Sequence, residues 1–549
     1  MKPFSFLWQK SPRVVLSAIF LSILGGASGT LIIALIHRSL DDPDRIGTAL
    51  IWAFFGLCIG RMLLSAWAGI LIVRLVQGVI LDLRLKLSRL ILATPLATLE
   101  KLRAPRLLAN LTEDMTALGN GLAAIPHFLV QAVILVGCFI YLGWLSPVLL
   151  ATVLGLWIFG FFTYKIPMRR AFRRYILIRQ TQDRLYQHFR ALTEGIKELK
   201  LSTPKRDNFY EEMFRPTADQ VRRHTVFGDS LYAISTHWGN LVYFLIIGFL
   251  LFVFRGVLGL DEVALTGGVL LILFMIGPMG TILAVMPALA KTTVALAKLE
   301  RLGFTLEDAS GGTIPKNETL VSGWHSVALK DVRHTYYREK EDATFTMGPL
   351  NFTLHAGETV FLVGGNGSGK TTLAKLLTGL YQPESGDILL DGEPVRTGEG
   401  APYRNLFAVV FSDFFLFENL LGHQPNATEA QRYLETLELD RKVAIENGVF
   451  TTVDLSQGQR KRLALLAAYL EDRPIYVFDE WAADQDPLFK EIFYTQLLPD
   501  LKAKGKTLLV ITHDDHYFHL AGRIVKMSDG QIEHDAPETA MGILGASNL

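Results

Sequence analysis

Cysteine is almost absent from this sequence. The 549 residues include two cysteines, Cys58 and Cys138, and each lies inside an apolar stretch. Two such positions exclude a disulfide framework and a cysteine-rich zinc site. We expect both to be small buried hydrophobic residues.

Charged residues are also scarce. They form 19% of the chain, against about 25% in soluble globular proteins, and half of all residues are hydrophobic. This composition excludes a typical soluble enzyme. It also excludes a disordered or collagen-like chain, because such chains contain few apolar residues.

The net charge of +1 is the sum of two oppositely charged halves of the sequence. Residues 1–300 contain 31 Lys and Arg and 18 Asp and Glu, whereas residues 301–549 contain 23 and 35. The two halves therefore carry net charges of +13 and −12. This asymmetry predicts two domains of different character, with a boundary near residue 300.

The first half contains six apolar segments that are long enough to cross a bilayer, which requires about 20 residues each. Such segments also occur as buried helices of large soluble proteins, but six within 300 residues favour membrane spans. The first is too long for the core of a signal peptide, so we expect it to be retained. The segments cover roughly residues 14–36, 50–77, 125–145, 147–166, 231–254 and 264–290.

Basic residues mark the side of the membrane on which the connections lie. The tail before residue 14 has three basic and no acidic residues, and residues 165–229 have 15 basic and eight acidic ones. By the positive-inside rule, this tail and the long connections 78–124 and 165–229 are cytoplasmic. Both chain termini are then cytoplasmic as well.

Residues 169–200 contain no proline and show apolar residues at helical spacing. The pattern predicts a membrane helix that continues well beyond the bilayer. We expect its basic residues to be solvated and partly in contact with anionic lipid headgroups. The membrane segments on either side argue against nucleic-acid binding.

A polar segment rich in glycine and serine, residues 310–323, reads as a linker. After it, short β-type runs alternate with helical stretches, which is typical of an α/β domain. We therefore predict a transmembrane domain over residues 1–305, a linker over 306–325 and an α/β domain over 326–549.

A strand-like run, residues 359–363, leads directly into GGNGSGKTT, which matches the pattern G-x-x-x-x-G-K-[ST]. Glycines allow backbone N–H groups to point at phosphate oxygens, and the following helix adds its positive end. We expect Lys370 to reach the β- and γ-phosphates and the Thr371 hydroxyl to bind Mg²⁺. The nucleotide-binding residues predicted in this loop are Gly364, Asn366, Gly367, Ser368, Gly369, Lys370, Thr371 and Thr372.

A second apolar run, residues 474–478, ends in Asp479 and Glu480. A carboxylate at such a strand end can hold Mg²⁺, and the next one can polarise the attacking water. An isolated Asp-Glu pair is usually a solvated loop, but here a phosphate-binding loop lies upstream. We therefore expect both carboxylates to act on a bound nucleotide.

Between these two motifs, Ser456 and Gly458 precede a helix rich in Ala and Leu. The start of such a helix is a second anion site. One chain cannot easily place two phosphate-binding helix ends on one γ-phosphate, so the pattern predicts that a second copy contributes this one.

With these motifs in this order, the chain resembles the ATP-binding cassette (ABC) exporter family over essentially its whole length. The resemblance implies an α-helical six-span transmembrane domain followed by a C-terminal α/β P-loop nucleotide-binding domain. LSQGQ at 455–459 is similar to the family signature LSGGQ, with Gln457 in place of the first glycine. Residues 483–486 match the D-loop, with Asp486 as its aspartate.

Further roles are implied by the same resemblance. Glu480 matches the catalytic glutamate, Asp479 the Walker B aspartate that holds Mg²⁺, and His513 the catalytic switch histidine. The further residues implied to contact ATP are Tyr336, which matches the adenine-stacking aromatic residue, and Ser456, Gln457, Gly458, Gln459 and Asp486.

One family position departs from the pattern. A glutamine normally follows the strand near residue 411 and contacts Mg²⁺, but this chain has Ser412 there. A serine hydroxyl can still reach a metal-bound water, so Ser412 is retained as a candidate metal ligand beside Thr371 and Asp479.

Further sequence likeness narrows the function that the resemblance implies. VFSDFFLFENLLG, LSQGQRKRLALL and FDEWAADQDP are similar to bacterial cyclic-peptide and siderophore-peptide exporters, with the closest likeness to exporters of pyoverdine precursors and syringomycin-type lipopeptides. This implies a half-transporter that dimerises with a second copy in the bacterial inner membrane and uses ATP and Mg²⁺ to export a peptide-like compound.

Two other functions are compatible with the same motifs. One is a lipid or multidrug exporter of the same architecture, and the other is a regulatory membrane ATPase, against which Glu480 and His513 argue. The candidate substrate contacts are polar residues within spans, namely Arg61, His237 and Asn240.

Overall fold

The computed structural model describes residues 7–8, 10–41, 47–102, 107–108, 110–254, 262–310, 323–338, 343–395, 400–422 and 426–537. The chain divides into two compact units. The helical unit comprises Met1–Leu85 and Ala109–Arg301, and the sheet unit comprises Lys86–Leu108 and Leu302–Leu549.

Six helical segments in the described residues are long and apolar enough to cross a membrane, and they coincide with the six predicted spans. The prediction of six spans is therefore confirmed. The helices that build them are α2 (Pro12–Asp41), α3 (Thr48–Ala93), η2 (Asn110–Asp114), α6 (Met115–Ala123), α7 (Ile125–Leu145), α8 (Pro147–Glu194), α10 (Thr203–Asn208), η3 (Phe209–Phe214), α11 (Arg215–Gly248), η4 (Phe249–Phe254) and α13 (Glu262–Ser310).

The helix predicted to continue beyond the bilayer is α8, a single helix of 48 residues, whereas a bilayer requires about 20. It begins at Pro147, after the Ser146 hydroxyl accepts a hydrogen bond from the Leu149 N–H at 3.3 Å. Proline suits this first position, since its missing N–H would be unpaired there. The helix runs without a break to Glu194, where Gly195 separates it from the short α9 (Ile196–Leu201).

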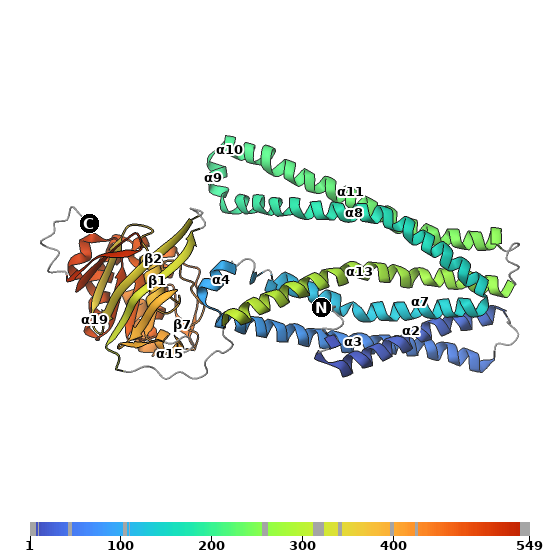
Figure 1. The fold of residues 1–549 in the computed structure, drawn as a ribbon, viewed down its shortest axis with the longest axis horizontal. Helices are drawn as coiled ribbons and strands as arrows, with labels where there is room; N and C mark the ends of the chain where they lie inside the picture. The colour runs from blue at the N-terminus through green and yellow to red at the C-terminus, as the bar shows by residue number, and fades with distance from the viewer. Residues whose placement is uncertain are drawn as a thin grey trace. The chain divides into compact units, whose positions relative to one another are not determined.

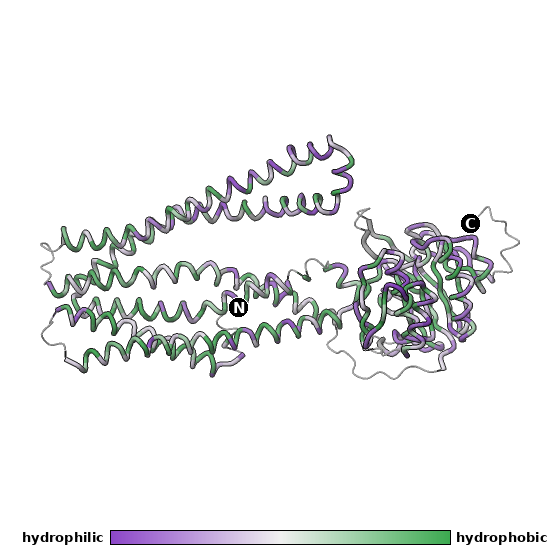
Figure 2. The backbone as a smooth tube through the Cα atoms, turned by 180° about the vertical axis from the view of Figure 1, so that it is seen from behind, coloured by the Kyte–Doolittle hydropathy of each residue, from purple (hydrophilic) through white to green (hydrophobic). Residues whose placement is uncertain are grey.

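Helix α11 returns beside α8, and the pair forms a long hairpin (Figure 1). The hairpin is hydrophobic at one end and strongly hydrophilic near the tip that carries α9 and α10 (Figure 2). The hydrophobic end corresponds to the predicted spans, and the hydrophilic end to the predicted cytoplasmic connection.

Small residues allow the other helices of this unit to approach closely. A Cβ atom at Gly26 of α2 would lie 2.7 Å from Val133 of α7, so no larger residue fits. His37 lies where three helices meet, with its ring nitrogens 2.9 Å from the Tyr141 hydroxyl and 3.0 Å from the Val263 carbonyl oxygen. Both nitrogens are therefore satisfied, and the ring connects α2 to α7 and α13.

The sheet unit contains a four-stranded antiparallel sheet in the order β2-β1-β4-β5 and a six-stranded sheet in the order β12-β11-β3-β10-β9-β6. All neighbours in the larger sheet run parallel except the edge pair β11 and β12. The strands of both sheets are β1 (Ser326–Arg338), β2 (Ala343–His355), β3 (Thr359–Gly364), β4 (Ser385–Leu390), β5 (Glu393–Pro394), β6 (Phe407–Val410), β9 (Ile475–Asp479), β10 (Thr507–Ile511), β11 (Arg523–Ser528) and β12 (Gln531–Pro537).

Short helices and a small ribbon complete the sheet unit. The alternation of strands and helices confirms the α/β class expected from the sequence. The elements are α4 (Leu96–Leu102), α14 (Lys370–Leu377), α15 (Gly400–Arg404), α16 (Ala427–Thr436), β7 (Ile445–Glu446), β8 (Val449–Phe450), α17 (Gln457–Leu470), η5 (Trp481–Asp484), α18 (Pro487–Ile492), η6 (Phe493–Leu497), α19 (Leu498–Ala503) and η7 (Asp515–Leu520).

Strands β9 and β10 are buried along their whole length, and β3 is buried up to its last residue. Their continuous apolar runs are typical of parallel strands that are covered on both faces. Because these strands and β6 run parallel, their carboxyl ends lie at one edge of the sheet. The segments that follow these four strands therefore come together there.

Helix α4 belongs to the sheet unit although it follows a membrane helix. Its Leu96 and Ala97 pack against the hydrophobic core of this unit. The Glu100 carboxylate accepts hydrogen bonds from the Lys375 ammonium at 3.0 Å and from the Tyr381 hydroxyl at 2.5 Å. The chain that leaves α3 is thereby joined to the helix α14.

Two local expectations need adjustment. Cys138 is buried as expected, but Cys58 is only partly buried. Helix α13 continues to Ser310, so residues 306–310 of the predicted linker are helical. The stretch 311–322 of that linker lies outside the described residues.

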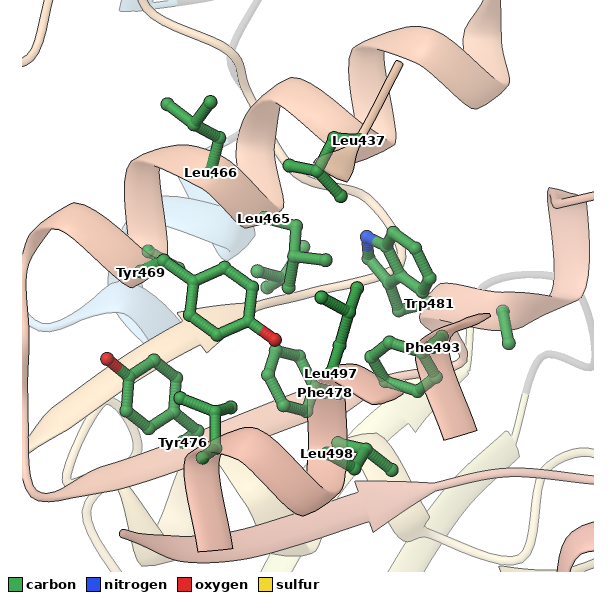
Figure 3. Close-up of a cluster of buried hydrophobic side chains, with 14 of the residues drawn as sticks. Leu437, Leu465, Leu466, Tyr469, Tyr476, Phe478, Trp481, Phe493, Leu497 and Leu498 are labelled. Atoms are coloured by element: carbon green, nitrogen blue, oxygen red, sulfur yellow. The ribbon is translucent and has the colours of Figure 1, made fainter. Parts of the chain in front are cut away.

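A second core cluster surrounds Trp481, whose side chain is 2% exposed. Figure 3 shows it against Phe493 and close to leucines of neighbouring segments. The ring centroids of Trp481 and Phe493 are 4.5 Å apart, and the indole N–H donates to the Lys461 carbonyl oxygen at 2.9 Å. The tryptophan thus fixes the backbone next to Glu480.

We predict that Trp481→Ala lowers the free energy of unfolding by about 3–5 kcal/mol, because it leaves a cavity in the core and removes the hydrogen bond of the indole N–H. Differential scanning calorimetry of the full-length protein in detergent measures the effect as a lower melting temperature. Trp144→Ala is the control, since Trp144 is 79% exposed. Equal melting temperatures for the two variants would contradict the prediction.

Candidate functional site

The predicted phosphate-binding loop connects β3 to α14. Gly364 and Gly369 have φ angles of +148° and +104°, which favour glycine. A Cβ atom at Gly364 would lie 2.2 Å from the Met527 carbonyl oxygen, so the neighbouring strand also excludes a side chain there. The loop therefore needs both glycines to reach the start of α14, where backbone N–H groups are unpaired.

Lys370 lies at the centre of this loop and is only 5% exposed. Its ammonium group donates hydrogen bonds to the carbonyl oxygens of Gly364 and Gly365, at 2.8 and 3.1 Å. Burial lowers the pKa of Lys370, and the nearby carboxylates of Glu480 and Asp479 oppose that shift. The ammonium nitrogen also lies 3.9 Å from Glu480 Oε1, and a polyanionic ligand would add further negative charge beside this buried cation.

Asp479, at the end of β9, is completely buried. The Thr371 hydroxyl donates to its carboxylate at 3.0 Å, and the Ser412 hydroxyl donates at 3.2 Å. Burial raises the pKa of Asp479, and these two hydrogen bonds partly counteract it. The Thr371 and Ser412 hydroxyls therefore both contact the Asp479 carboxylate, which brings the three proposed metal ligands together.

Glu480 follows with a positive φ of 50°, which is strained for a residue other than glycine. Its backbone N–H donates to the Ile511 carbonyl oxygen at 3.0 Å. Its side chain points to the loop, because His513 Nε2 lies 3.2 Å from Glu480 Oε1 and 3.2 Å from Lys370 Nζ. This nitrogen donates to the carboxylate in one tautomer and accepts from the ammonium in the other.

The residues at this sheet edge fit a nucleoside triphosphate. The Ser368 hydroxyl is buried and has no hydrogen-bond partner among the described residues, so a phosphate oxygen would satisfy it. Thr371, Asp479 and Ser412 offer oxygen atoms only, which is the donor set that Mg²⁺ prefers. When bound, the metal would neutralise phosphate charge.

The signature segment lies elsewhere in the same unit, at the start of α17. Ser456 caps this helix: its hydroxyl accepts from the Gln459 N–H, and the Gln459 side chain accepts from the Ser456 N–H, both at 3.4 Å. The Gln457 amide donates to Asp484 at 3.3 Å, and the Gly458 carbonyl oxygen accepts from Gln485 at 3.1 Å. These bonds order the helix start without using the phosphate-binding loop.

Two basic residues next to the signature escaped the sequence analysis. Lys461 is 3% exposed; its ammonium group lies 2.7 Å from Asp484 and donates to the Glu480 carbonyl oxygen at 3.3 Å. Arg462 pairs with Asp486 at 2.6 Å and lies 3.2 Å from the centre of the Phe489 ring. The adjacent basic residues Lys461 and Arg462 are visible in the sequence as part of QRKRL. Their acidic partners, however, are decided by the tertiary structure.

Asp486 also caps α18, since its carboxylate accepts from the Phe489 N–H at 3.0 Å. The pairs made by Lys461 and Arg462 therefore connect the signature helix to the backbone of Glu480 and to the predicted D-loop. Tyr336 lies in β1 opposite Phe345, and its side chain lies outside the described part of the structure.

The three candidate substrate contacts do not lie together. Arg61 lines a cavity of about 340 Å³ with His127 and Gln131, and its guanidinium lies 5.9 Å from the centre of the Phe274 ring. Asn240 lines a different cavity, between α8, α11 and α13. His237 is exposed on α11.

Family models match two regions of the chain. Residues 14–279 match the model described as "ABC transporter transmembrane region", and residues 347–483 match the model described as "ABC transporter". The second region contains the phosphate-binding loop, the signature segment, Asp479 and Glu480.

Several characterised proteins are similar along nearly their full length. "ATP-binding protein SyrD" of Pseudomonas syringae pv. syringae is 36% identical, covering 96% of this chain and 95% of SyrD. The "ATP-dependent lipid A-core flippase" of Escherichia coli (strain K12) is 25% identical, covering 93% and 90%. The solved "Structure of a bacterial Atm1-family ABC exporter with ATP bound" shares the fold, with a TM-score of 0.72, 17% identity and 97% of each chain covered.

We predict that Ser412→Ala lowers Mg²⁺-dependent ATP hydrolysis by about threefold to tenfold, because it removes one of the hydrogen bonds that orient Asp479. The backbone N–H at this position, 3.5 Å from Asp479, remains. The control is Thr436→Ala, whose hydroxyl bonds only within its own helix at an exposed position. Complete loss of Mg²⁺-dependent turnover would mean that the Ser412 hydroxyl is an indispensable metal ligand, contrary to this prediction.

Proposed function

Because the chain belongs to the ABC transporter family, we propose that it exports a peptide-like compound across the bacterial inner membrane as an ATP-driven homodimer. The compound is a siderophore precursor or a cyclic peptide or lipopeptide. The observation that carries the proposal is the convergence of Lys370, Thr371, Asp479, Glu480 and His513 at one sheet edge, in a chain whose described residues include six helical segments able to span a membrane.

Each residue of this edge has a role in ATP hydrolysis that follows from its position. Lys370 and the helix start behind it bind the β- and γ-phosphates. Thr371 and Asp479 would hold Mg²⁺, with Ser412 as a further candidate ligand. Glu480 lies beside the loop with a strained backbone and accepts a proton from the attacking water, while His513 bridges it to Lys370.

The homodimer is supported by the position of the signature segment. Ser456 and Gln457 are exposed, and the hydrogen bonds of Ser456 and Gly458 order the start of α17 within the chain itself. An ordered helix start with unpaired backbone N–H groups is suited to an anion that another copy holds. Two chains in head-to-tail contact would complete two such sites, each with the Lys370 loop of one copy and the Ser456 helix start of the other.

A route from this site toward the membrane is present in the sheet unit. Helix α14 carries Lys370 and Thr371 at its start and Lys375 near its end. Lys375 pairs with Glu100 of α4, and only two residues separate α4 from the end of α3. A shift of α14 after hydrolysis is therefore transmitted through this ion pair to the end of a spanning helix.

The peptide-like cargo is supported by the resemblance to syringomycin-type and pyoverdine-precursor exporters. SyrD, at 36% identity, is more similar than the lipid A-core flippases, at 25–26%. The location follows from the six spans and the basic connections, which predict cytoplasmic termini. A lipid exporter of the same architecture is the second candidate, favoured by the flippase relatives.

We predict that Glu480→Gln lowers ATP hydrolysis by about 100-fold or more while leaving ATP binding intact, because an amide cannot accept the proton. Phosphate release and nucleotide binding are measured on the purified full-length protein. Glu471→Gln, at an exposed position, is the matched control. Turnover within a factor of two of the wild type would show that another group is the base.

We also expect inverted membrane vesicles to take up a fluorescent N-dodecanoylated tripeptide when Mg²⁺ and ATP are present. Vesicles with the Glu480→Gln variant serve as the control and should show no uptake. ATP hydrolysis without uptake would contradict peptide export. Uptake of headgroup-labelled phosphatidylethanolamine in place of the peptide would support the lipid alternative.

A further inference from the structure

Lys461, near the start of α17, contacts the segment that carries Glu480 with both its side chain and its backbone. Its ammonium group lies 2.7 Å from Asp484 Oδ2 and donates to the Glu480 carbonyl oxygen at 3.3 Å. Its own carbonyl oxygen accepts from the Trp481 indole N–H at 2.9 Å. One lysine therefore binds three residues of this segment.

The burial of Lys461 is unequal to that of its partner. The lysine side chain is 3% exposed, whereas the Asp484 side chain is 48% exposed. Burying an ammonium group is costly unless the group is paired and hydrogen-bonded. A buried ion pair is also weak evidence for added stability, because an apolar side chain of similar shape often stabilises a fold equally well. The role of Lys461 therefore has to follow from what it contacts.

The most informative of these contacts is the Glu480 backbone. Glu480 has φ 50° and ψ 34°, a left-handed conformation that a residue other than glycine keeps only where its surroundings fix it. Its N–H donates to the Ile511 carbonyl oxygen at 3.0 Å. Its carbonyl oxygen accepts from the Lys461 ammonium group and from the Ala483 N–H at 3.2 Å. The strained residue is thus fixed from both sides.

The Asp484 carboxylate also holds the start of α17. The Gln457 amide donates at 3.3 Å to Asp484 Oδ2, the same oxygen that pairs with Lys461. A glycine at position 457, as in the family signature, could not form this bond. The departure from the signature therefore has a partner in the structure, and the polar contacts continue from Gln457 through Asp484 and Lys461 to Glu480.

Helix α17 is a firm support for these contacts. Its Leu465 and Leu466 are fully buried and belong to the same hydrophobic cluster as Trp481 (Figure 3). Arg462 holds the far end of the segment by pairing with Asp486 at 2.6 Å. A side chain on a well-packed helix can keep a functional group within the narrow limits that catalysis requires.

We propose that Lys461 is a positioning residue for Glu480. It fixes the left-handed backbone through the carbonyl oxygen, so that the Glu480 carboxylate stays directed at His513 and the Lys370 loop, and Asp484 orients the ammonium group. Within the described residues, the ion pair and hydrogen bond of the Lys461 side chain both go to residues 480–484. Lys461 therefore acts through Glu480, and this role rests on the proposed function, in which Glu480 is the base.

A purely structural ion pair elsewhere in the sheet unit provides a matched control. The Lys506 ammonium group lies 2.7 Å from the Asp472 carboxylate and donates to the Asp472 carbonyl oxygen at 3.4 Å. Asp472 also has a left-handed φ, of 47°. Lys506 thus makes the same two kinds of contact with the same backbone conformation, at a turn that does not carry the proposed base.

We expect Lys461→Met to lower kcat for ATP hydrolysis about tenfold to 100-fold, because displacing a reacting group by about 1 Å can cost 100-fold in rate. KM and the affinity for ATP should stay within about twofold, because the lost interaction serves the chemical step. Lys506→Met should leave kcat within about twofold of the wild type. Phosphate release and nucleotide binding are measured on the purified full-length protein, and calorimetry compares the folding of both variants.

A double-mutant cycle tests whether Lys461 acts through Glu480. In the Glu480→Gln background, Lys461→Met should lower the residual release of radiolabelled phosphate by less than about twofold, because the group it positions is already lost. Asp484→Ala, at a half-exposed side chain, should lower kcat about threefold or more and add nothing to Lys461→Met.

Three results would overturn this role for Lys461. They are a kcat of Lys461→Met within about twofold of the wild type, an equal loss in Lys506→Met, and an equal loss in the Glu480→Gln background. If size-exclusion chromatography shows that Lys461→Met is misfolded, Asp484→Ala, with and without Glu480→Gln, decides the result.

The proposed function fails in a different way. If the wild type does not hydrolyse ATP, or if Glu480→Gln hydrolyses it as fast as the wild type, the assignment of Glu480 as the base is wrong and the role of Lys461 falls with it. If Glu480→Gln abolishes hydrolysis while Lys461→Met leaves kcat unchanged, only the positioning role is wrong.

Discussion

The complete burial of the Asp479 carboxylate is the constraint on which the nucleotide site depends. A buried carboxylate needs hydrogen bonds, and here the Thr371 and Ser412 hydroxyls provide them. These donors follow β3 and β6, which are not neighbours in the sheet, so the carboxylate holds together segments from three strands. Burial raises its pKa, and a divalent cation would restore the charged form.

The burial of charged groups also determines how Lys370 and Glu480 are arranged. The ammonium group of Lys370 is buried among loop carbonyl oxygens, and its pKa is lowered by burial. Glu480 faces it through His513, on a strained backbone that the neighbouring Trp481 fixes in the core. The site is therefore preorganised for a polyanion before any ligand arrives.

The helical unit meets a different constraint, since the membrane offers no water to its polar groups. Glycines permit close contact between α2 and α7, and His37 satisfies both ring nitrogens between three helices. Between α8, α11 and α13, the packing leaves a cavity lined by aromatic and aliphatic side chains.

Properties that depend on neighbours along the chain were predictable from the sequence. The six spans follow from apolar length, and the loop around Lys370 follows from glycine spacing between a strand and a helix. Asp479 and Glu480 were identified because a carboxylate pair ends an apolar strand. Contacts between residues far apart in the sequence were decided by the tertiary structure. They include the hydrogen bond from Ser412 to Asp479, the ion pairs of Arg462 with Asp486 and of Lys375 with Glu100, and the cavity beside Trp157. The physical reason is that backbone conformation and hydropathy are local, whereas the burial and pairing of a side chain depend on which residues the fold brings beside it.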